Sequence, residues 1–208
     1  MAAASIPKPL RHEIVPRSEL PIDTVELARF LIGKIVVRAT PEGPLTGRIV
    51  ETEAYPIGDA AGHAYGGETL RNRALFLTRG HAYVYRAYGV SYLLSVASEA
   101  AGYGAGVLLR ALEPLEGVAT MQKNRRVETV HDLARGPGRL TMALGVDLRM
   151  DGIDLCRTGA LWISRAADTA ENDIGTSTRI GISQDSGRLL RFYVRKCRFV
   201  SGPKRLNR

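Results

Sequence analysis

The sequence predicts a single α/β (α+β) domain, built as a mixed and largely antiparallel sheet with helices around it. The 208 residues are 45% hydrophobic and 24% charged with only 2 cysteines, so a chain of this length can bury a core without metals or disulfides. Segments with the period of strands outnumber those with the period of helices. Residues 1–21 are rich in Ala and Pro and are expected to form a flexible arm, and residues 22–208 are expected to form the domain.

Three helices are expected. The first begins after Asp23, whose side chain can cap the opening turn, and it ends at Gly33. A second helix is expected to open at Pro114, because proline is favoured in the first turn. A third is expected over residues 139–144, after a Gly-Pro-Gly turn.

Strands are expected wherever apolar alternation is bounded by turn residues. The expected strands are residues 35–38, 47–55, 83–87, 92–97, 106–112, 160–164, 179–183 and 189–194. The third and fourth of these form a hairpin with Tyr88 beside Gly89 at its tip. A large ring on a tight turn is hard to bury, and beside a basic surface it suits a wedge between base pairs.

The net charge of +8 is concentrated at one end of the chain. Residues 186–208 contain eight Lys or Arg residues and no acidic residue. Clustered basic side chains displace the counterions of a polyanion, which indicates nucleic acid as a partner. The alternative is a solvated tail that only aids solubility.

Two carboxylates stand close together in the strand 47–55. Period-two alternation places Ile49, Glu51, Glu53 and Tyr55 on one face, which is either a solvated sheet face or part of a site. Arg110 stands alone in an apolar strand, where a buried charge needs an acidic partner. That partner is either Glu113 or a neighbour, or it is Glu51 or Glu53 at a pocket.

His63 lies in a loop, residues 56–67, that is long enough to fold over a site. It could bind a metal, belong to an acid/base pair or form a pocket wall. Metal is the weakest interpretation, because no second histidine stands at ligand spacing. Tyr83 and Tyr85 share a strand face, and Tyr83 is expected to pack in the core. No nucleotide, flavin, nicotinamide or Fe–S motif is present, so neither a cofactor nor a metal is expected.

Taken together, these segments resemble the alkyladenine (3-methyladenine) DNA glycosylase family, the type without a helix-hairpin-helix. The matching segments are residues 47–55, 63, 71–73, 83–85, 88–89, 107–117, 135–140 and 190–195. They follow one another in the family's order and cover most of the chain from about Asp23. The resemblance implies a compact domain with a curved sheet and a protruding hairpin that inserts into DNA.

The resemblance also implies an activity, the hydrolytic excision of alkylated or deaminated purines from duplex DNA in base excision repair. The substrates would be 3-methyladenine, 7-methylguanine and hypoxanthine, each flipped out of the duplex. Glu53 resembles the base that activates water for attack on C1′, and Arg110 resembles the arginine that orients it. The resemblance, and not the spacing, separates Glu53 from Glu51.

The base pocket implied by the resemblance has Tyr55, His63 and Tyr85 as its walls. Tyr88 would fill the gap that the flipped nucleotide leaves. Ser95 departs from the family, whose members usually carry an Asn seven residues after the wedge tyrosine. That Asn is thought to exclude guanine, so we expect Ser95 to loosen discrimination among purines.

The expected partner is double-stranded DNA with damaged purines, bound by a monomer that has no membrane partner. No signal peptide or apolar stretch of membrane-spanning length is found, so a cytoplasmic location is expected, at the nucleoid in a bacterium. One alternative is a non-catalytic protein that binds damaged DNA. A second is an RNA-binding or hydrolytic α/β protein that uses Glu51 and Glu53 as paired carboxylates.

Overall fold

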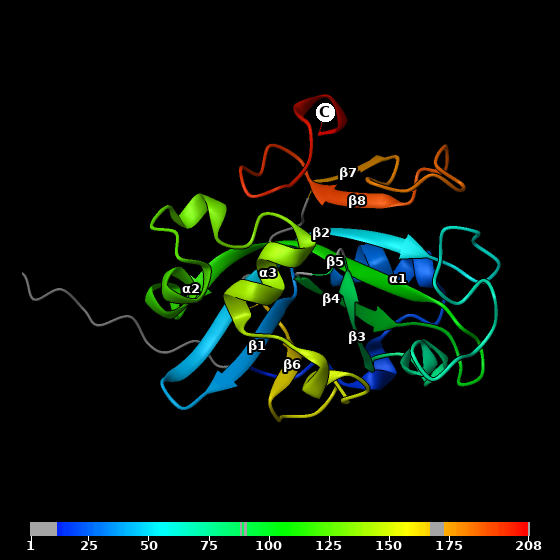
Figure 1. Ribbon diagram of the computed structural model, residues 1–208, viewed down its shortest axis with the longest axis horizontal. Coiled ribbons are helices and arrows are strands. Elements are labelled where there is room, and N and C mark those ends of the chain that lie inside the picture. Colours follow the sequence, from blue (N-terminus) through cyan, green and yellow to red (C-terminus); the bar gives the residue numbers. More distant parts are fainter. Residues whose placement is uncertain (1–11, 88, 90, 167–172, 208) are drawn as a thin grey trace, which may run out of the picture.

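A computed structural model describes residues 12–87, 89, 91–166 and 173–207. Within these residues the chain forms a curled, antiparallel, eight-stranded sheet in the order β3-β4-β5-β2-β1-β6, with β8 paired to β2 and β7 to β8 (Figure 1). The strands are β1 (Ile35–Thr40), β2 (Gly43–Tyr55), β3 (Ala82–Ala87), β4 (Ser91–Ala97), β5 (Gly106–Glu116), β6 (Leu161–Ser164), β7 (Ile174–Ser177) and β8 (Arg191–Val194). The described α-helices are α1 (Thr24–Leu31), α2 (Val118–Arg125) and α3 (Pro137–Leu144). The predicted α/β class with a largely antiparallel sheet is confirmed.

Helix α1 begins and ends as the sequence predicts. The side chain of Asp23 accepts hydrogen bonds from the backbone N–H groups of Val25 (2.8 Å) and Glu26 (2.9 Å), which satisfies donors at the first turn. Gly33 follows the helix with a φ of +84°, a conformation that glycine adopts without strain. The helix packs against β2, where the Thr52 hydroxyl donates to the Ala28 carbonyl (2.9 Å).

Strand β2 is the central element of the sheet. One edge pairs with β5, while the other pairs first with β1 and then, at residues 51–53, with β8. The register with β5 shifts on both sides of Glu51, and such a bulge breaks the alternation of side chains. Ile49 therefore packs in the main core, whereas Val50 packs in a second cluster with Tyr193. The prediction that Ile49 shares a face with Glu51 is wrong for this reason.

Two predicted elements differ from the structure. Strand β5 continues through Pro114 to Glu116, and α2 begins only at Val118. The proline is tolerated because the ladder to β2 shifts its register beside it. The sequence predicts a strand over residues 179–183, but the strand there is β7, which ends at Ser177. The chain leaves the sheet before Arg179, whose side chain turns into the protein interior.

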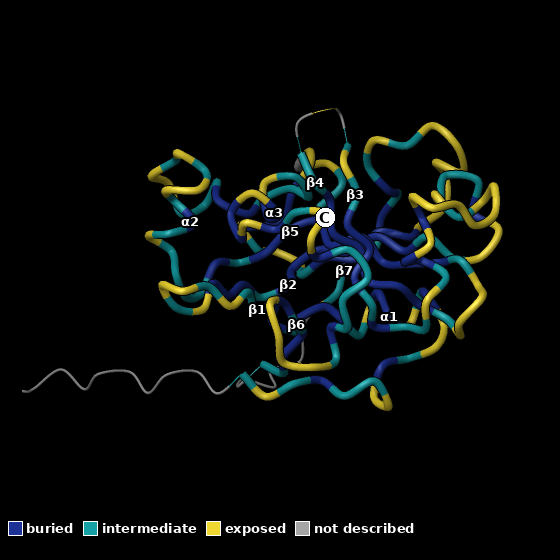
Figure 2. The backbone as a smooth tube through the Cα atoms, turned by 60° about the horizontal axis from the view of Figure 1, so that its bottom comes forward, coloured by how far each residue is buried: buried dark blue, intermediate teal, exposed yellow. Residues whose placement is uncertain are grey.

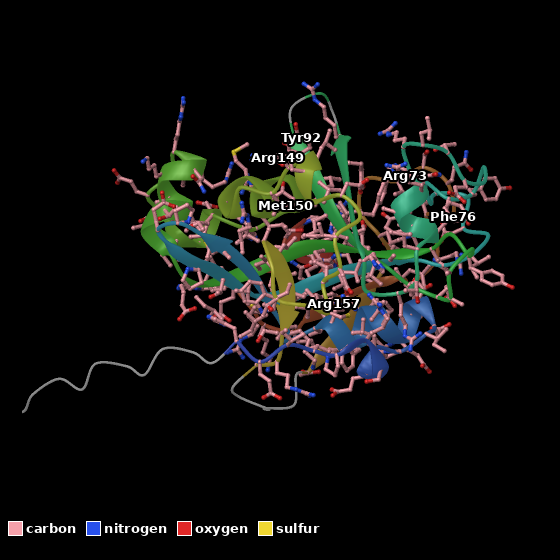
Figure 3. The ribbon with its side chains drawn as sticks, turned by 90° about the horizontal axis from the view of Figure 1, so that it is seen from below. Arg73, Phe76, Tyr92, Arg149, Met150 and Arg157 are labelled. Carbon is pink, nitrogen blue, oxygen red and sulfur yellow. The ribbon has the colours of Figure 1, made fainter. Side chains whose placement is uncertain are left out.

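The core lies between the sheet and its helices. Figure 2 shows buried backbone along the sheet and exposed backbone mainly in the surrounding loops. Tyr92 on β4 packs against the main cluster, which contains Met150, whereas Arg149 and Arg157 extend largely exposed side chains (Figure 3).

The described part of the predicted arm, residues 12–21, packs against the domain. Val15 and Leu20 are buried, and Ile14 forms a β-bridge with Ser164. The expectation of a flexible arm therefore does not hold for these residues, because their apolar side chains complete the core. Residues 1–11 lie outside the described part of the chain. In the described part, no helix combines the length and apolar character needed to cross a membrane.

Candidate active site

The two carboxylates of β2 are buried and share one arginine. Glu51 and Glu53 are fully buried, and Arg110 on β5 is 6% exposed. The Arg110 Nε donates to Glu51 Oε1 (2.9 Å), and its Nη1 lies 3.2 Å from Glu53 Oε2. Glu113 lies instead beside Arg48, at 3.7 Å. The two carboxylates therefore do not lie on a solvated sheet face. Of the two sets of partners expected for Arg110, the structure shows Glu51 and Glu53 and not Glu113.

Glu53 is held by three donors. Besides Arg110, the Tyr55 hydroxyl donates to Oε2 (2.9 Å) and the Ile180 backbone N–H donates to Oε1 (2.7 Å). Burial raises the pKa of Glu53, and although Arg110, the Ile180 N–H and the Tyr55 hydroxyl oppose it, the pKa stays above its ordinary value. Burial and the Glu53 charge also raise the pKa of Tyr55. Tyr55 is therefore a neutral donor to the carboxylate.

Glu51 has the opposite balance. Burial acts to raise the pKa of Glu51, but the charges of Arg110 and Arg191, together with hydrogen bonds from Arg191 and the Ser201 N–H, bring it below its ordinary value. Glu51 is therefore the permanent anion of the pair. Two acids whose surroundings move their pKa values apart are suited to different roles.

A cavity of about 850 Å³ lies beside this cluster. Its lining includes an aromatic wall of Tyr55, His63, Tyr83 and Tyr85, together with Arg110 and the largely exposed Tyr65. Tyr83 and Tyr85 stack with ring centroids 4.9 Å apart, and His63 meets Tyr85 edge-on at 4.5 Å. The volume is in the range of small-molecule binding sites. The lining suits a flat, aromatic ligand.

Glu53 lies directly behind the cavity wall and does not line it. Its three donors, from Arg110, Tyr55 and Ile180, belong to residues that do line the cavity. A water from the cavity would reach the carboxylate only after one of these groups moves, two of which are side chains and one the Ile180 backbone N–H. The structure thus brings together Glu53, Arg110, Tyr55 and the aromatic wall, as the sequence predicted.

His63 forms part of the cavity wall. Its Nδ1 lies 2.9 Å from the Tyr83 hydroxyl, and its carbonyl accepts a hydrogen bond from Asn72 Nδ2 (2.8 Å). Burial, together with the charge of Arg71, lowers the pKa of His63, which favours a neutral ring. In the described residues, no group of three His, Cys, Asp or Glu side chains is placed to hold a metal. Tyr83 is 1% exposed, as expected for a residue of the core.

Sequence reasoning missed a buried ion pair that holds the cavity wall. Arg179 and Asp59 are both fully buried at their side chains and lie 2.8 Å apart. The Arg179 guanidinium also donates to the Ala54 carbonyl (3.0 Å) and lies 4.6 Å from the centre of the Tyr55 ring. It therefore fastens the loop 56–67 over Tyr55. The two partners are 120 positions apart, and no local pattern connects them.

Two further predicted site residues have different outcomes. Ser95 on β4 is 6% exposed, lines the cavity and pairs in register with Leu108 of β5. The predicted wedge residue, Tyr88, lies outside the described residues. Its flanking strands β3 and β4 pair antiparallel from Ala82↔Val96 to Ala87↔Ser91.

Several basic side chains of residues 186–208 form ion pairs within the protein. Arg191 is fully buried and bonds to Glu51 (2.7 Å), and Arg188 bonds to Asp59 (3.0 Å). Arg195 lies 3.2 Å from Asp173. The predicted cluster is therefore less available to a polyanion than the sequence suggests, because tertiary contacts give some of its charges acidic partners.

The curled antiparallel sheet carries a buried Glu–Arg–Tyr cluster behind an aromatic cavity, and this arrangement of ionisable groups at a small-molecule cavity is typical of an enzyme. The family model of Methylpurine-DNA glycosylase (MPG) matches residues 18–198, and the chain belongs to this family of DNA glycosylases, which are hydrolases of N-glycosidic bonds.

Proteins from three organisms illustrate the similarity. The chain is 62% identical over 195 residues to a protein of Mesorhizobium japonicum, covering 94% of this chain and 93% of the relative. It is 52% identical to a protein of Paraburkholderia phytofirmans (91% and 89% covered) and 43% identical to one of Methanoculleus marisnigri (86% and 94%). All three carry the name "Putative 3-methyladenine DNA glycosylase".

Proposed function

We propose that this DNA glycosylase is monofunctional and hydrolytically excises alkylated or deaminated purines from duplex DNA, with Glu53 as the general base. The observation that carries the proposal is the fully buried Glu53 carboxylate, held by groups that line an aromatic cavity. The substrates are 3-methyladenine, 7-methylguanine and hypoxanthine. The partner is duplex DNA with such a base, and the working unit is a monomer in the cytoplasm, at the nucleoid in a bacterium.

The reaction requires that the damaged nucleotide leave the base stack, because the duplex hides C1′ from attack. Tyr88 inserts into the vacated stack and compensates part of the flipping cost of a few kcal/mol. The flipped base enters between Tyr55, His63 and Tyr85. A base alkylated at N3 or N7 is cationic, and tyrosine faces stabilise a cation by about 0.5–2 kcal/mol.

Hydrolysis then proceeds from a water held at Glu53. The ionised carboxylate takes a proton from the water, whose oxygen forms a bond to C1′. The bond between C1′ and the purine nitrogen breaks, and its electron pair leaves with the base. The products are the free base and an abasic site. Arg110 keeps Glu53 ionised and oriented, and in the described lining of the cavity no lysine offers an amine as a competing nucleophile.

Alkylated and deaminated bases make different demands on the site. A cationic alkylpurine is already a good leaving group and needs little acid catalysis. Hypoxanthine is neutral and needs more help from hydrogen bonding or protonation. Ser95, at the cavity wall, loosens the pocket toward guanine derivatives because it is shorter than the usual Asn.

The test is release of free base from duplexes that contain hypoxanthine, 3-methyladenine or 7-methylguanine. The wild type is expected to release base and leave an abasic site, whereas Glu53→Gln loses about 100-fold or more of the single-turnover rate. Glu51→Gln is the matched comparison, a buried carboxylate on the same strand, and is expected to retain base release. Binding without release by the wild type would favour a protein that only senses damage. Loss in Glu51→Gln equal to that in Glu53→Gln would favour paired carboxylates.

A further inference from the structure

Arg191 uses every N–H of its guanidinium although it is fully buried. The acceptors are Glu51 Oε1 (2.7 Å), Ser177 Oγ (2.8 Å), the Leu206 carbonyl (3.0 Å), the Ser201 carbonyl (3.1 Å) and Asn207 Oδ1 (2.7 Å). Three of these acceptors belong to residues 201–207. The C-terminal segment therefore encloses the arginine, and Figure 1 shows that segment, in red, beside β7 and β8.

The same segment also reaches Glu51 directly. The Ser201 backbone N–H donates to Glu51 Oε2 (2.6 Å), and its hydroxyl donates to Oε1 (3.0 Å). The Arg110 Nη2 lies 3.5 Å from the same hydroxyl. A continuous chain of contacts thus runs from Arg191 through Glu51 and Arg110 to Glu53.

We infer that Arg191 and Ser201 are positioning residues of this reaction, which hold Glu51 so that Arg110 stays shared with Glu53. The inference rests on the proposed role of Glu53. Arg191 does not line the cavity, and although it is the register partner of Glu53 in the β2–β8 ladder, its guanidinium has no described hydrogen bond to the Glu53 carboxylate. The side chain therefore acts through Glu51 and Arg110.

The physical basis is competition between two buried carboxylates for one cation. With Arg191 and Ser201 in place, Glu51 is satisfied and Arg110 can keep its Nη1 at Glu53. Without Arg191, Arg110 would be the only positive charge left among the described partners of Glu51, because Ser201 supplies uncharged donors. A buried charge without a counter-charge is strongly unfavourable. Arg110 would move toward Glu51 and leave Glu53 harder to ionise.

Removal of the Glu51 charge has the opposite effect. In Glu51→Gln, the neutral amide competes weakly for Arg110 and no longer repels a second anion, so Glu53 becomes easier to ionise. The charged and titratable groups with the largest described effects on Glu53 are Arg110 from β5, and Tyr55 and Glu51 from β2, and Arg191 from β8 is its register partner. From the loop after β7 it receives the Ile180 N–H. The substitutions at positions 191 and 51 thus leave Tyr55 and Ile180 unchanged.

The experiment is the pH profile of the single-turnover rate of hypoxanthine release, with saturating enzyme and rates expressed per folded molecule. Arg191→Met is expected to move the midpoint of the acid limb up by about one pH unit, and Glu51→Gln is expected to move it down by about one, the size typical for a charge near a carboxylate. Opposite shifts would support the inference. Midpoints that stay at the wild-type value, or shifts in the same direction, would overturn it, since a merely structural role gives one of those results.

Matched controls come from the ion pair of Arg17 and Asp154, which lies outside the cavity lining (2.7 Å, with side chains 31% and 21% exposed). Arg17→Met and Asp154→Asn make the same chemical changes, and both are expected to keep the wild-type midpoint. A moved midpoint in these controls would overturn the inference, because the shifts would then follow from lost stability alone.

Ser201→Ala keeps the inference testable if Arg191→Met does not fold. It removes only a hydroxyl and leaves the backbone N–H on Glu51. Its midpoint is expected to rise by a smaller amount, and an unmoved midpoint in a folded Ser201→Ala would overturn the inference. Failure of the proposed function looks different, because Glu53→Gln would then release base as fast as the wild type.

Discussion

Glu51 and Glu53 lie two positions apart on β2 and share Arg110, yet their pKa values move in opposite directions. Both are buried, so burial alone cannot separate them. The difference comes from further partners, because Glu51 also has the charge of Arg191, whereas Glu53 has only uncharged donors besides Arg110. One arginine therefore serves a permanent anion and a carboxylate that can exchange a proton.

The raised pKa of Glu53 predicts a limit on activity at low pH. A general base must be ionised, so the single-turnover rate should fall as the pH drops through the Glu53 pKa, with a midpoint above the ordinary value of 4.5. Arg110→Met should move this midpoint further up, because it removes the nearest positive charge. A rate that is unchanged through this limb would contradict Glu53 as the base. The measurement is the release of 7-methylguanine, with protein folding checked by circular dichroism at each pH.

Tyr88→Ala should weaken excision from duplex DNA and barely change the chemical step on a base that is already unpaired. The expected reason is that the ring stabilises the vacated stack and takes no part in bond cleavage. Single-turnover rates on a hypoxanthine duplex and on a single strand measure the two effects. Equal losses on both substrates would show that Tyr88 does not act as a wedge.

Ser95→Asn should lower the ratio of 7-methylguanine to 3-methyladenine excision. A longer amide at this cavity position crowds the exocyclic amino group of guanine, which adenine lacks at that carbon. Competition between both lesions in one reaction measures the ratio directly, and Ser183→Asn, at another cavity-lining serine, serves as the control. Identical ratios in the wild type and Ser95→Asn would contradict the proposal that Ser95 loosens the pocket toward guanine derivatives.

Asp59→Asn should destabilise the protein by about 3–5 kcal/mol, because it leaves Arg179 buried without its anion. Chemical denaturation monitored by tryptophan fluorescence measures the free energy of unfolding. Asp147→Asn is the control, since Asp147 pairs with Arg149 at the surface, where such pairs contribute little. Similar destabilisation in both variants would contradict the assignment of Asp59 and Arg179 as a buried clamp.

Much of the local structure could be predicted because its causes are local. Asp23 caps α1 through donors two and three positions away, and Glu51 and Glu53, predicted to share one side of β2, both contact Arg110. The sequence predicts an earlier end for β5, since Pro114 usually disrupts a ladder. The proline is accommodated because the pairing of β5 with β2 shifts its register beside Pro114, which only the tertiary structure reveals.

The sequence by itself determined the family and indicated Glu53, Arg110, Tyr55 and His63 as candidate site residues, because their types and order along the chain carry that information. Only the tertiary structure decided which charges meet. Arg191 reaches Glu51 across 140 positions, and Arg179 reaches Asp59 across 120. A buried charge needs a counter-charge, and only the fold decides which residues lie close enough to supply it. Arg191 belongs to the segment that the sequence predicts to be a basic surface, yet it is buried and pairs with Glu51.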